Sequence, residues 1–270
     1  MDKKPYIIMI ASQKGGVGKT TIALNLAVAL RYKNLNVLLV DTDLESASAS
    51  EQLGIRIDGR GYFDVVNGDA EVREAIFAYE PIDLHIIPGS PAKELNKIEP
   101  RDLDRFYAKL SKLEYDFIII DSPPGLFPEI IAKYLNDVAI LTTPDSISSV
   151  GSSRMAMYCE KYKIEHRLII NRMGYSKFDL EREEVEQLFG DVSFQTVPED
   201  KIIPESVLKH KPAYLIDKNA YFCLAIDEIA RDYTLKLSGP AENRGPGLEP
   251  DRSMEPSAFE KLARWFFRSR

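Results

Sequence analysis

The sequence is poor in the residues that build disulfide frameworks, metal clusters and histidine-based catalytic sites. Its 270 residues include two cysteines and three histidines. Cys159 and Cys223 lie far apart without metal-ligand spacing, which fits a reducing compartment and core or surface thiols. His85, His166 and His210 are scattered, so we interpret each as structural or exposed. These scarcities argue against a secreted disulfide scaffold, a zinc site and a histidine-dependent active site.

Long hydrophobic runs and a positive net charge are also missing. No segment approaches the length of a membrane-spanning helix, and the apolar run 6–12 is too short for a signal sequence. The formal net charge of −7 argues against a general nucleic-acid binder. Hydrophobic residues make up 44% of the chain, which is sufficient for a full globular core. We therefore expect one large or two small folded domains.

Short apolar runs alternate with amphipathic stretches along most of the chain. Almost uniformly apolar runs are typical of parallel strands covered on both faces, and they occur at 6–12, 37–41, 84–89, 117–121, 138–143 and 167–171. Helices are predicted at 20–33, 182–190 and roughly 219–234. This alternation predicts an α/β fold with a doubly wound, mostly parallel sheet. Ligands then bind beyond the carboxyl ends of the strands.

A glycine-rich segment, QKGGVGKTT (13–21), lies between the first predicted strand and the first predicted helix. Its glycines allow the backbone amides to turn toward a phosphate, and the helix adds the positive end of its dipole. In this setting Lys19 reaches the β- and γ-phosphates and Thr20 can ligate Mg²⁺. The strand–loop–helix context disfavours the alternative of a turn without a ligand. The predicted nucleotide-binding residues are Lys14, Gly15, Gly16, Val17, Gly18, Lys19, Thr20 and Thr21.

Acidic side chains follow two of the predicted strands. Asp41 and Asp43 end the segment VLLVDTD, and Asp121 ends FIIID. A buried strand that delivers a carboxylate beside a phosphate loop is the Walker B arrangement, which contributes to Mg²⁺ coordination. One such carboxylate could instead cap a helix. Two strand ends beside a phosphate loop favour the site.

The order Lys-Gly-Gly-x-Gly-Lys-Thr, with Gln13 at the usual first glycine position, resembles the deviant phosphate loop of the MinD/ParA family of ATPases. The resemblance implies ATP and Mg²⁺ as cofactors and a dimer of two ATP-bound subunits that meet face to face. It further implies that Lys14 contacts the phosphates bound by the partner subunit. The catalytic residues implied are Lys14, Lys19, Asp43 and Asp121, and the metal-site residues are Thr20, Asp43 and Asp121.

Several later segments extend the resemblance over roughly residues 5–235. DSPPG (121–125) is similar to the second switch of the family, and LTTP (141–144) to the strand that follows it. INR (170–172) is similar to the adenine-contacting segment and VPED (197–200) to the loop that covers the base. The base-side residues implied are Asn171, Arg172, Pro198, Glu199 and Asp200. The segments SQKGG and DTDLESASAS depart from typical bacterial MinD, which leaves the branch of the family open.

The composition changes after residue 237. We predict an ATPase domain at 1–237, a flexible linker at 238–256 rich in proline and glycine, and an amphipathic helix at 257–270. A helical arrangement of SAFEKLARWFFRSR separates an aromatic face from a basic face, which is typical of a membrane-targeting helix. Docking on the domain itself or in a partner's groove are the alternatives. The predicted membrane contacts are Phe259, Leu262, Trp265, Phe266 and Phe267 together with Lys261, Arg264 and Arg268.

By resemblance we expect a slow, partner-stimulated ATPase of MinD type that acts in the choice of the cell-division site. The expected partners are a second copy when ATP is bound, anionic membrane lipids, an activator of MinE type and an effector of MinC type. The expected location is cytoplasmic, peripheral on the inner face of the cell membrane. The alternatives are a flagellar-number regulator, disfavoured because the loop begins at residue 13, a ParA-type DNA-partitioning ATPase and a non-hydrolysing adaptor. Gln13 favours the ParA type, whereas the acidic body and aromatic tail do not.

Overall fold

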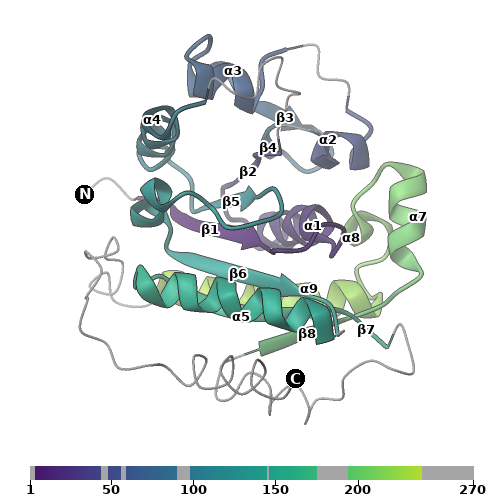
Figure 1. Ribbon diagram of the computed structural model, residues 1–270. Coiled ribbons are helices and arrows are strands. Elements are labelled where there is room, and N and C mark those ends of the chain that lie inside the picture. Colours follow the sequence, from purple (N-terminus) through teal and green to yellow (C-terminus); the bar gives the residue numbers. More distant parts are fainter. Residues whose placement is uncertain are drawn as a thin grey trace, which may run out of the picture.

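An eight-stranded sheet forms the centre of the protein (Figure 1). The computed structural model describes residues 4–43, 48–55, 59–89, 98–144, 146–174 and 194–238. The strand order is β3-β4-β2-β5-β1-β6-β7-β8, and every neighbouring pair except β3–β4 is parallel. The strands are β1 (Tyr6–Ala11), β2 (Val37–Asp41), β3 (Phe77–Tyr79), β4 (Leu84–Ile87), β5 (Phe117–Asp121), β6 (Asp137–Thr142), β7 (Glu165–Met173) and β8 (Phe194–Pro198). The prediction of a mostly parallel α/β sheet is confirmed.

Helices cover both faces of the sheet, and each face has its own apolar core. One core contains side chains from α1 (Lys19–Tyr32), α2 (Ser48–Gln52), α7 (Ile202–Lys209), α8 (Ala213–Ile216) and α9 (Tyr221–Ser238). The other contains side chains from α3 (Tyr62–Asn67), η1 (Val72–Ala75), α4 (Pro100–Leu110), η3 (Glu129–Tyr134) and α5 (Ser146–Lys161). Because both faces of the central strands are covered, their side chains are apolar without alternation.

The last helix is attached to the sheet by a buried ion pair. Asp137 of β6 accepts a hydrogen bond from Arg167 of β7 at 3.0 Å and another from the Tyr233 hydroxyl at 3.2 Å. Lys236 also donates to Asp137, at 3.0 Å. Buried carboxylates need such partners, because an unpaired charge in the interior costs several kcal/mol. Helix α9 ends at Ser238, four residues beyond its predicted end.

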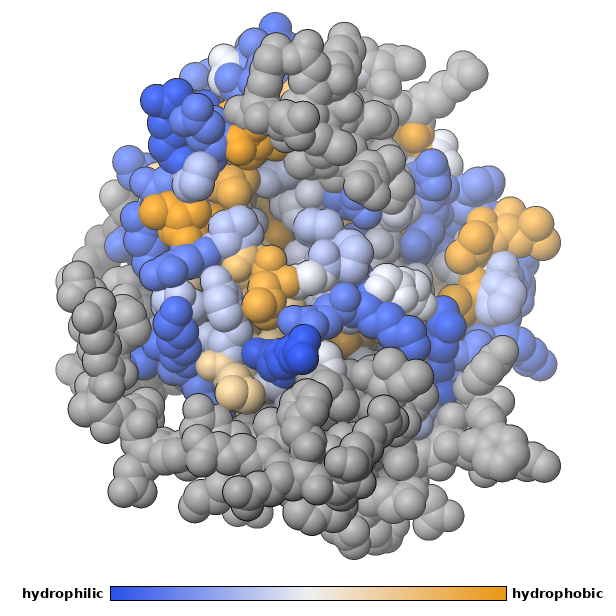
Figure 2. Space-filling model, in the orientation of Figure 1, coloured by the Kyte–Doolittle hydropathy of each residue, from blue (hydrophilic) through white to orange (hydrophobic). Residues whose placement is uncertain are grey.

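Several sequence predictions fall on residues outside the described ranges. They are the helix at 182–190, the linker from 239 onward and the amphipathic helix at 257–270 with all its predicted membrane contacts. Within the described ranges, no helix combines the length and apolarity needed to span a membrane. Apolar surface is visible over α7 (Figure 2), where Val207 and Leu208 are exposed. Two neighbouring residues do not make a large patch, since single exposed apolar side chains are common.

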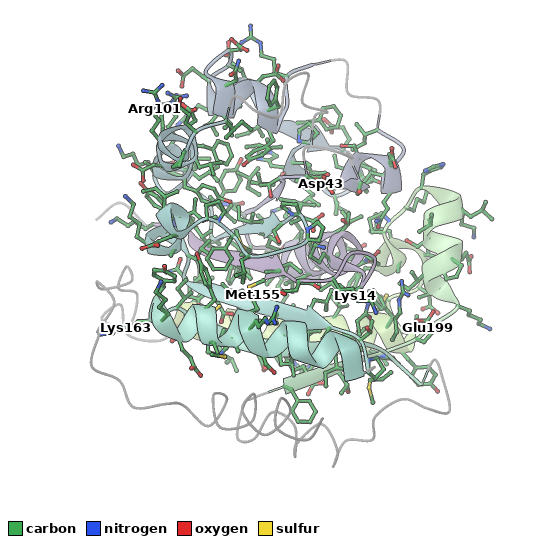
Figure 3. The ribbon with its side chains drawn as sticks, in the orientation of Figure 1. Lys14, Asp43, Arg101, Met155, Lys163 and Glu199 are labelled. Atoms are coloured by element: carbon green, nitrogen blue, oxygen red, sulfur yellow. The ribbon has the colours of Figure 1, made fainter. Side chains whose placement is uncertain are left out.

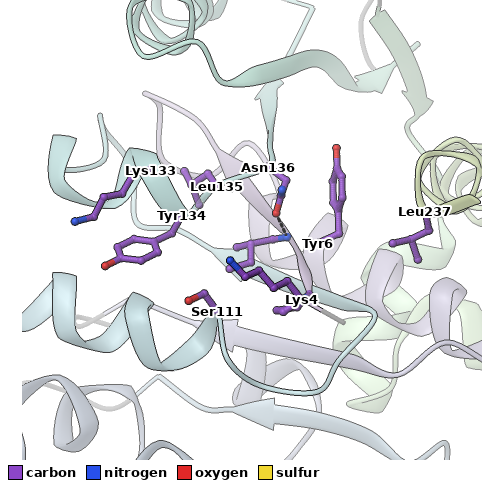
Figure 4. Close-up of a pocket in the computed structure, with 10 residues that line it drawn as sticks. Lys4, Tyr6, Ser111, Lys133, Tyr134, Leu135, Asn136 and Leu237 are labelled. Carbon is purple, nitrogen blue, oxygen red and sulfur yellow. Dashed lines mark hydrogen bonds between the residues drawn. The ribbon is translucent and has the colours of Figure 1, made fainter. Parts of the chain in front are cut away.

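A cavity of about 380 Å³ lies where β1 begins, at the amino end of the parallel strands (Figure 4). Its lining includes Lys4, Tyr6, Tyr134 and Leu237. One polar contact in its wall is the hydrogen bond that the Ile7 amide donates to the Asn136 side chain, at 2.8 Å. Ligands of doubly wound folds bind at the carboxyl end of the sheet, so this cavity lies away from the candidate site.

Candidate active site

The phosphate loop connects β1 to α1 and leaves the first turn of the helix open. Gly18 precedes the helix in the left-handed region, with φ of 98°, and no side chain caps the helix. The first helical hydrogen bond runs from the Ile22 amide to the Gly18 carbonyl at 3.0 Å. The amides before Ile22 therefore have no acceptor within the helix and can face an anion. The first turn contains no acidic residue that would repel one.

Two glycines of the loop have different neighbours. A Cβ added at Gly18 would lie 2.5 Å from the Asn171 side-chain nitrogen, so the fold itself requires glycine there. A Cβ added at Gly15 would meet nothing within 4 Å, and its φ is not in the left-handed region. The fold places no demand on Gly15, but a phosphate held close to the backbone would. The open space at Gly15 is thus consistent with a cradle for a ligand.

Lys19 and three polar side chains come together at the end of the central strands. Lys19 is nearly buried, and burial lowers its pKa while the carboxylates of Asp121 and Asp43 act in the opposite direction. The Thr20 hydroxyl is hydrogen-bonded to Asp121. The structure therefore brings together the lysine, the hydroxyl and both acids that the sequence placed in one site. Figure 3 shows Lys14, Asp43 and Glu199 on the carboxyl side of the sheet and Lys163 on the other side.

Asp121 carries an unsatisfied buried oxygen, and a second carboxylate lies beside it. Its Oδ1 is buried and finds no hydrogen-bond partner among the residues that the structure describes. Asp121 lies beside Asp41 on the neighbouring strand, and burial together with that carboxylate raises the pKa of Asp121 well above its usual range. A buried carboxylate oxygen next to a threonine hydroxyl fits a hard cation such as Mg²⁺.

The protein itself supplies few ligands for such an ion. Among the described residues there is no group of three or more histidine, cysteine, aspartate or glutamate side chains that could hold a metal. Mg²⁺ commonly binds one or two protein ligands and completes its octahedral shell with phosphate oxygens and water. The residues present fit an ion that arrives with a nucleotide.

Asp41 has a role that the sequence did not identify. Its carboxylate accepts backbone hydrogen bonds from Asp43 at 3.1 Å, from Ala49 at 3.1 Å and from Gly89. Burial raises its pKa, and the three amides partly offset that effect. Asp41 thus holds the backbone of Asp43 and the start of α2 in place. An aspartate can accept a hydrogen bond from the backbone amide two residues further on, as Asp41 does from Asp43, but its distant partners were not predictable.

The segment after β5 is fastened to the phosphate-loop strand. The Ser122 hydroxyl donates to the Ile10 carbonyl at 2.9 Å, and the Gly125 amide donates to the Ser12 carbonyl at 2.9 Å. Gly125 has φ of 114°, which favours glycine. The predicted second switch is therefore attached directly to β1 and its loop. A change at the phosphates can therefore act on this segment through these two hydrogen bonds.

Lys14 occupies a different environment from Lys19. The Ser12 hydroxyl accepts from the Lys14 amide at 3.1 Å and donates to the Lys14 carbonyl at 3.0 Å, which fixes the backbone of this residue. Its side chain is exposed, whereas Lys19 is nearly buried within the site. The loop thus presents one lysine inward and one toward the surface.

The base-side residues are gathered near the loop, but two of them contact the protein itself. Asn171 donates to the Val17 carbonyl at 2.9 Å and so supports the phosphate loop. Asp200 accepts from the Ile202 amide at 3.0 Å and the Phe222 amide at 3.2 Å, which caps the starts of α7 and α9. Arg172 lies 4.0 Å from Glu199, and Pro198 ends β8. Contacts of these residues with a base stay a prediction.

Comparisons with known proteins agree with this geometry. The family model described as the CobQ/CobB/MinD/ParA nucleotide-binding domain matches residues 8–213. An uncharacterised ATP-binding protein of Methanocaldococcus jannaschii is 30% identical over 218 residues, covering 79% of this chain and 82% of that protein.

Two solved structures have the same fold. The septum site-determining protein MinD of Pyrococcus horikoshii, complexed with Mg-ADP, is 32% identical with a TM-score of 0.79, covering 87% of this chain and 98% of that one. The MinD of a MinC:MinD cell-division complex from Aquifex aeolicus has a TM-score of 0.73 at 23% identity, covering 85% of this chain and 95% of that one. This last likeness shows the fold alone.

The chain belongs to the CobQ/CobB/MinD/ParA family of nucleotide-binding domains, because the family model matches most of its length. Within that family it is a MinD-like ATPase.

Proposed function

We propose that this ATPase dimerises when it binds ATP, and that the dimer attaches reversibly to an anionic membrane to mark the cell-division site. The observation that carries the proposal is the pair of lysines in the loop. Lys19 is nearly buried beside Asp121 and Asp43, while the side chain of Lys14 is exposed from a fixed backbone. A second cation directed outward is suited to the nucleotide of a facing copy.

In this proposal each residue of the site has one task. Lys19 and the open amides of α1 bind the phosphates, and Thr20 and Asp121 hold Mg²⁺. The ion supplies positive charge at the phosphates during phosphoryl transfer. Asp43 positions the attacking water, with its backbone oriented by Asp41. Lys14 of each copy stabilises the charge that develops on the nucleotide of the other.

Membrane attachment is assigned to residues 257–270, joined to the ATPase domain through the proposed linker, which begins after the end of α9 at Ser238 and runs to residue 256. Each large apolar side chain contributes about 1.5–3 kcal/mol on burial, and each cation near an anionic leaflet about 1 kcal/mol. Ordering the helix costs about 1–2 kcal/mol per residue. One tail therefore binds marginally, and two tails in a dimer bind together because the second insertion is intramolecular. ATP binding would recruit the protein and hydrolysis would release it.

A role in cell division is supported by relatives. The Pyrococcus protein is named septum site-determining, and the Aquifex structure holds MinD together with MinC. These names suggest an effector of MinC type for this chain, and an activator of MinE type is proposed with it. The protein would thus lie in the cytoplasm and on the inner face of the membrane in turn.

Three lysine variants test the dimer proposal. Lys19→Ala is expected to lose ATP binding, because it removes the inward cation. Lys14→Ala is expected to keep ATP binding but to lose the ATP-dependent dimer in light scattering and most of the phosphate release. Lys112→Ala, an exposed lysine after α4, is the matched control and leaves all three measurements unchanged. Dimerisation of Lys14→Ala to the wild-type extent would exclude the role of Lys14.

The alternatives have separate readouts. A salt-sensitive gel shift with the ATP form would favour a ParA-type DNA-partitioning ATPase, since phosphate contacts weaken steeply with salt. Phosphate release that disappears in Asp43→Ala would exclude an adaptor that only binds ATP. Liposome co-sedimentation that is equal with ATP and ADP would exclude the membrane switch.

A further inference from the structure

The outer face of α9 carries a regular stripe of exposed side chains. Tyr221, Leu224 and Leu235 are 77%, 51% and 66% exposed, and Glu228 and Arg231 between them are also exposed. The spacing of these five residues alternates between three and four, which places them along one line of a helix. We call these five residues the α9 stripe. Three of its five members are large and apolar, although they face away from the domain.

The domain does not need these side chains for its own packing. The opposite face of α9 supplies Phe222, Ile226 and Tyr233, all nearly fully buried against α1, β8 and the sheet. The helix is also fixed by ion pairs of Lys33 with Asp227 at 2.7 Å and of Lys236 with Asp137. The helix is thus already anchored through its inner face. A rigid amphipathic face with apolar residues on both sides of a charged pair is suited to bind another helix.

We propose that the α9 stripe binds the α9 stripe of a second copy of this chain in an antiparallel, two-fold symmetric pair. In this register Leu224 lies opposite the partner's Leu235, and Glu228 lies opposite the partner's Arg231. Two-fold symmetry repeats both contacts, so the interface contains two leucine pairs and two opposite-charge pairs. Alternating steps of three and four residues are the seam of paired helices that cross at a shallow angle.

The charges select this arrangement over a parallel one. A parallel pair places Glu228 beside its own copy and Arg231 beside its own copy, which sets like charges against each other. The flanking acids do not disturb the antiparallel register, because they are bonded within their own subunit. Asp227 pairs with Lys33 at 2.7 Å and, at the longer distance of 3.5 Å, with Arg231 of its own helix, and Asp232 accepts from Gln195 at 2.8 Å. The exposed Arg231 guanidinium has further N–H groups that can donate to the partner's Glu228. Self-complementarity of charge is the reason to choose a second copy as the occupant.

The α9 pair is separate from the ATP-dependent dimer. The stripe lies on the exposed face of α9, whereas the phosphate loop follows β1 at the carboxyl end of the sheet. A molecule with two different two-fold interfaces can link into open chains. This consequence rests on the proposed function, but the α9 pair itself does not. A single helix pair is smaller than a standard interface, so we expect weak association in solution and stronger association where a membrane concentrates the protein.

Disulfide trapping of the full chain tests the register. The native Cys159 and Cys223 are fully buried and give a low background. A mixture of Leu224→Cys and Leu235→Cys chains should form disulfide dimers under mild oxidation, whereas either chain alone should not. A single variant should not form the disulfide, because in the antiparallel register the two copies of position 224 lie about 16 Å apart along the helix axis. Asp232→Cys, exposed on the same helix beside the stripe, is the matched control.

Two results would overturn the proposal. One is trapping of the mixture no faster than that of the Asp232→Cys control. The other is efficient trapping of each single variant with itself, which indicates a parallel pair. The measurement is made without nucleotide and again with the Lys14→Ala substitution added. Trapping that persists there, while the ATP-dependent dimer is lost, separates this interface from the proposed function.

Charge reversal provides an independent test in the same trapping assay. Glu228→Arg alone and Arg231→Glu alone should each slow trapping about fivefold to tenfold, because each turns attraction into repulsion. The double variant carrying both changes should recover the original rate. Failure of the double variant to recover, with circular dichroism unchanged, would contradict the pairing of Glu228 with Arg231.

Discussion

At the residue scale, Gly15 and Gly18 separate what the fold needs from what the ligand needs. Gly18→Ala forces a side chain into the left-handed region and within 2.5 Å of Asn171. We expect the unfolding free energy without nucleotide to fall by about 1–2 kcal/mol or more. At this chain length each kcal/mol lowers Tm by roughly 2–4 °C. Thermal unfolding without nucleotide measures the change.

Gly15→Ala is the matched partner of that variant. The added methyl group meets nothing within 4 Å, so the Tm without nucleotide should stay within the range of a surface substitution. The same methyl group occupies space beside the proposed phosphate, so Mg-ADP binding should weaken about tenfold. Unchanged Mg-ADP affinity in calorimetry would show that the phosphates do not approach Gly15.

The two thiols give a prediction of pH dependence. Burial raises the pKa of Cys159 from its ordinary value of 9.0 to about 12, and that of Cys223 also to about 12. Between pH 9 and about pH 12 the thiols of the unfolded chain lose protons that the folded chain retains. The free energy of unfolding therefore falls as the pH rises through this range. Near pH 8 the folded thiols should react with iodoacetamide at least about a hundredfold more slowly than in urea. Similar rates, followed by mass spectrometry, would contradict their burial.

At the element scale, Asp200 joins the starts of two helices. Its carboxylate accepts one amide hydrogen bond at the first residue of α7 and another at the first turn of α9. Loss of one such cap costs about 1 kcal/mol, so Asp200→Ala should lower the unfolding free energy by about 2 kcal/mol without nucleotide. Denaturation in urea measures this. Glu199→Ala, which removes a half-exposed group 4.0 Å from Arg172, should change it by less than about 0.5 kcal/mol. Equal losses in the two variants would contradict the capping role.

The central strands could be predicted from the sequence, but the edge strands could not. β1, β2, β5 and β6 are buried on both faces, so their sequences are continuous apolar runs. β3 is three residues long and exposes Phe77, and β8 is only partly buried. At an edge, pairing depends on the neighbouring strand rather than on a strong local pattern.

The same limit applies to the site. The phosphate loop and the acids at strand ends are local patterns, and in the structure Lys19 lies near Asp43 and Asp121. The support that Asp41 and Asp200 give comes from hydrogen bonds to backbone amides that lie up to tens of residues away in sequence. No local pattern specifies which loop returns to a carboxylate. Such positioning contacts therefore become visible only in the fold.

At the scale of the whole molecule, the proposed switch makes nucleotide and membrane binding interdependent. If ATP-bound dimers bind vesicles more tightly than ADP-bound monomers, then vesicles must favour the ATP-bound dimer by the same factor. Anionic vesicles should therefore lower the protein concentration at which ATP-dependent dimers form, by about fivefold or more. ATP-dependent dimerisation is measured with and without vesicles for two proteins. One is the full chain, and the other ends at Leu237, so that it keeps the nucleotide site but lacks the proposed membrane helix. In the shortened chain, vesicles should leave dimerisation unchanged, whereas ATP still promotes it. An equal response of both chains to vesicles would remove residues 257–270 from the switch and direct attention to the surface of the ATPase domain.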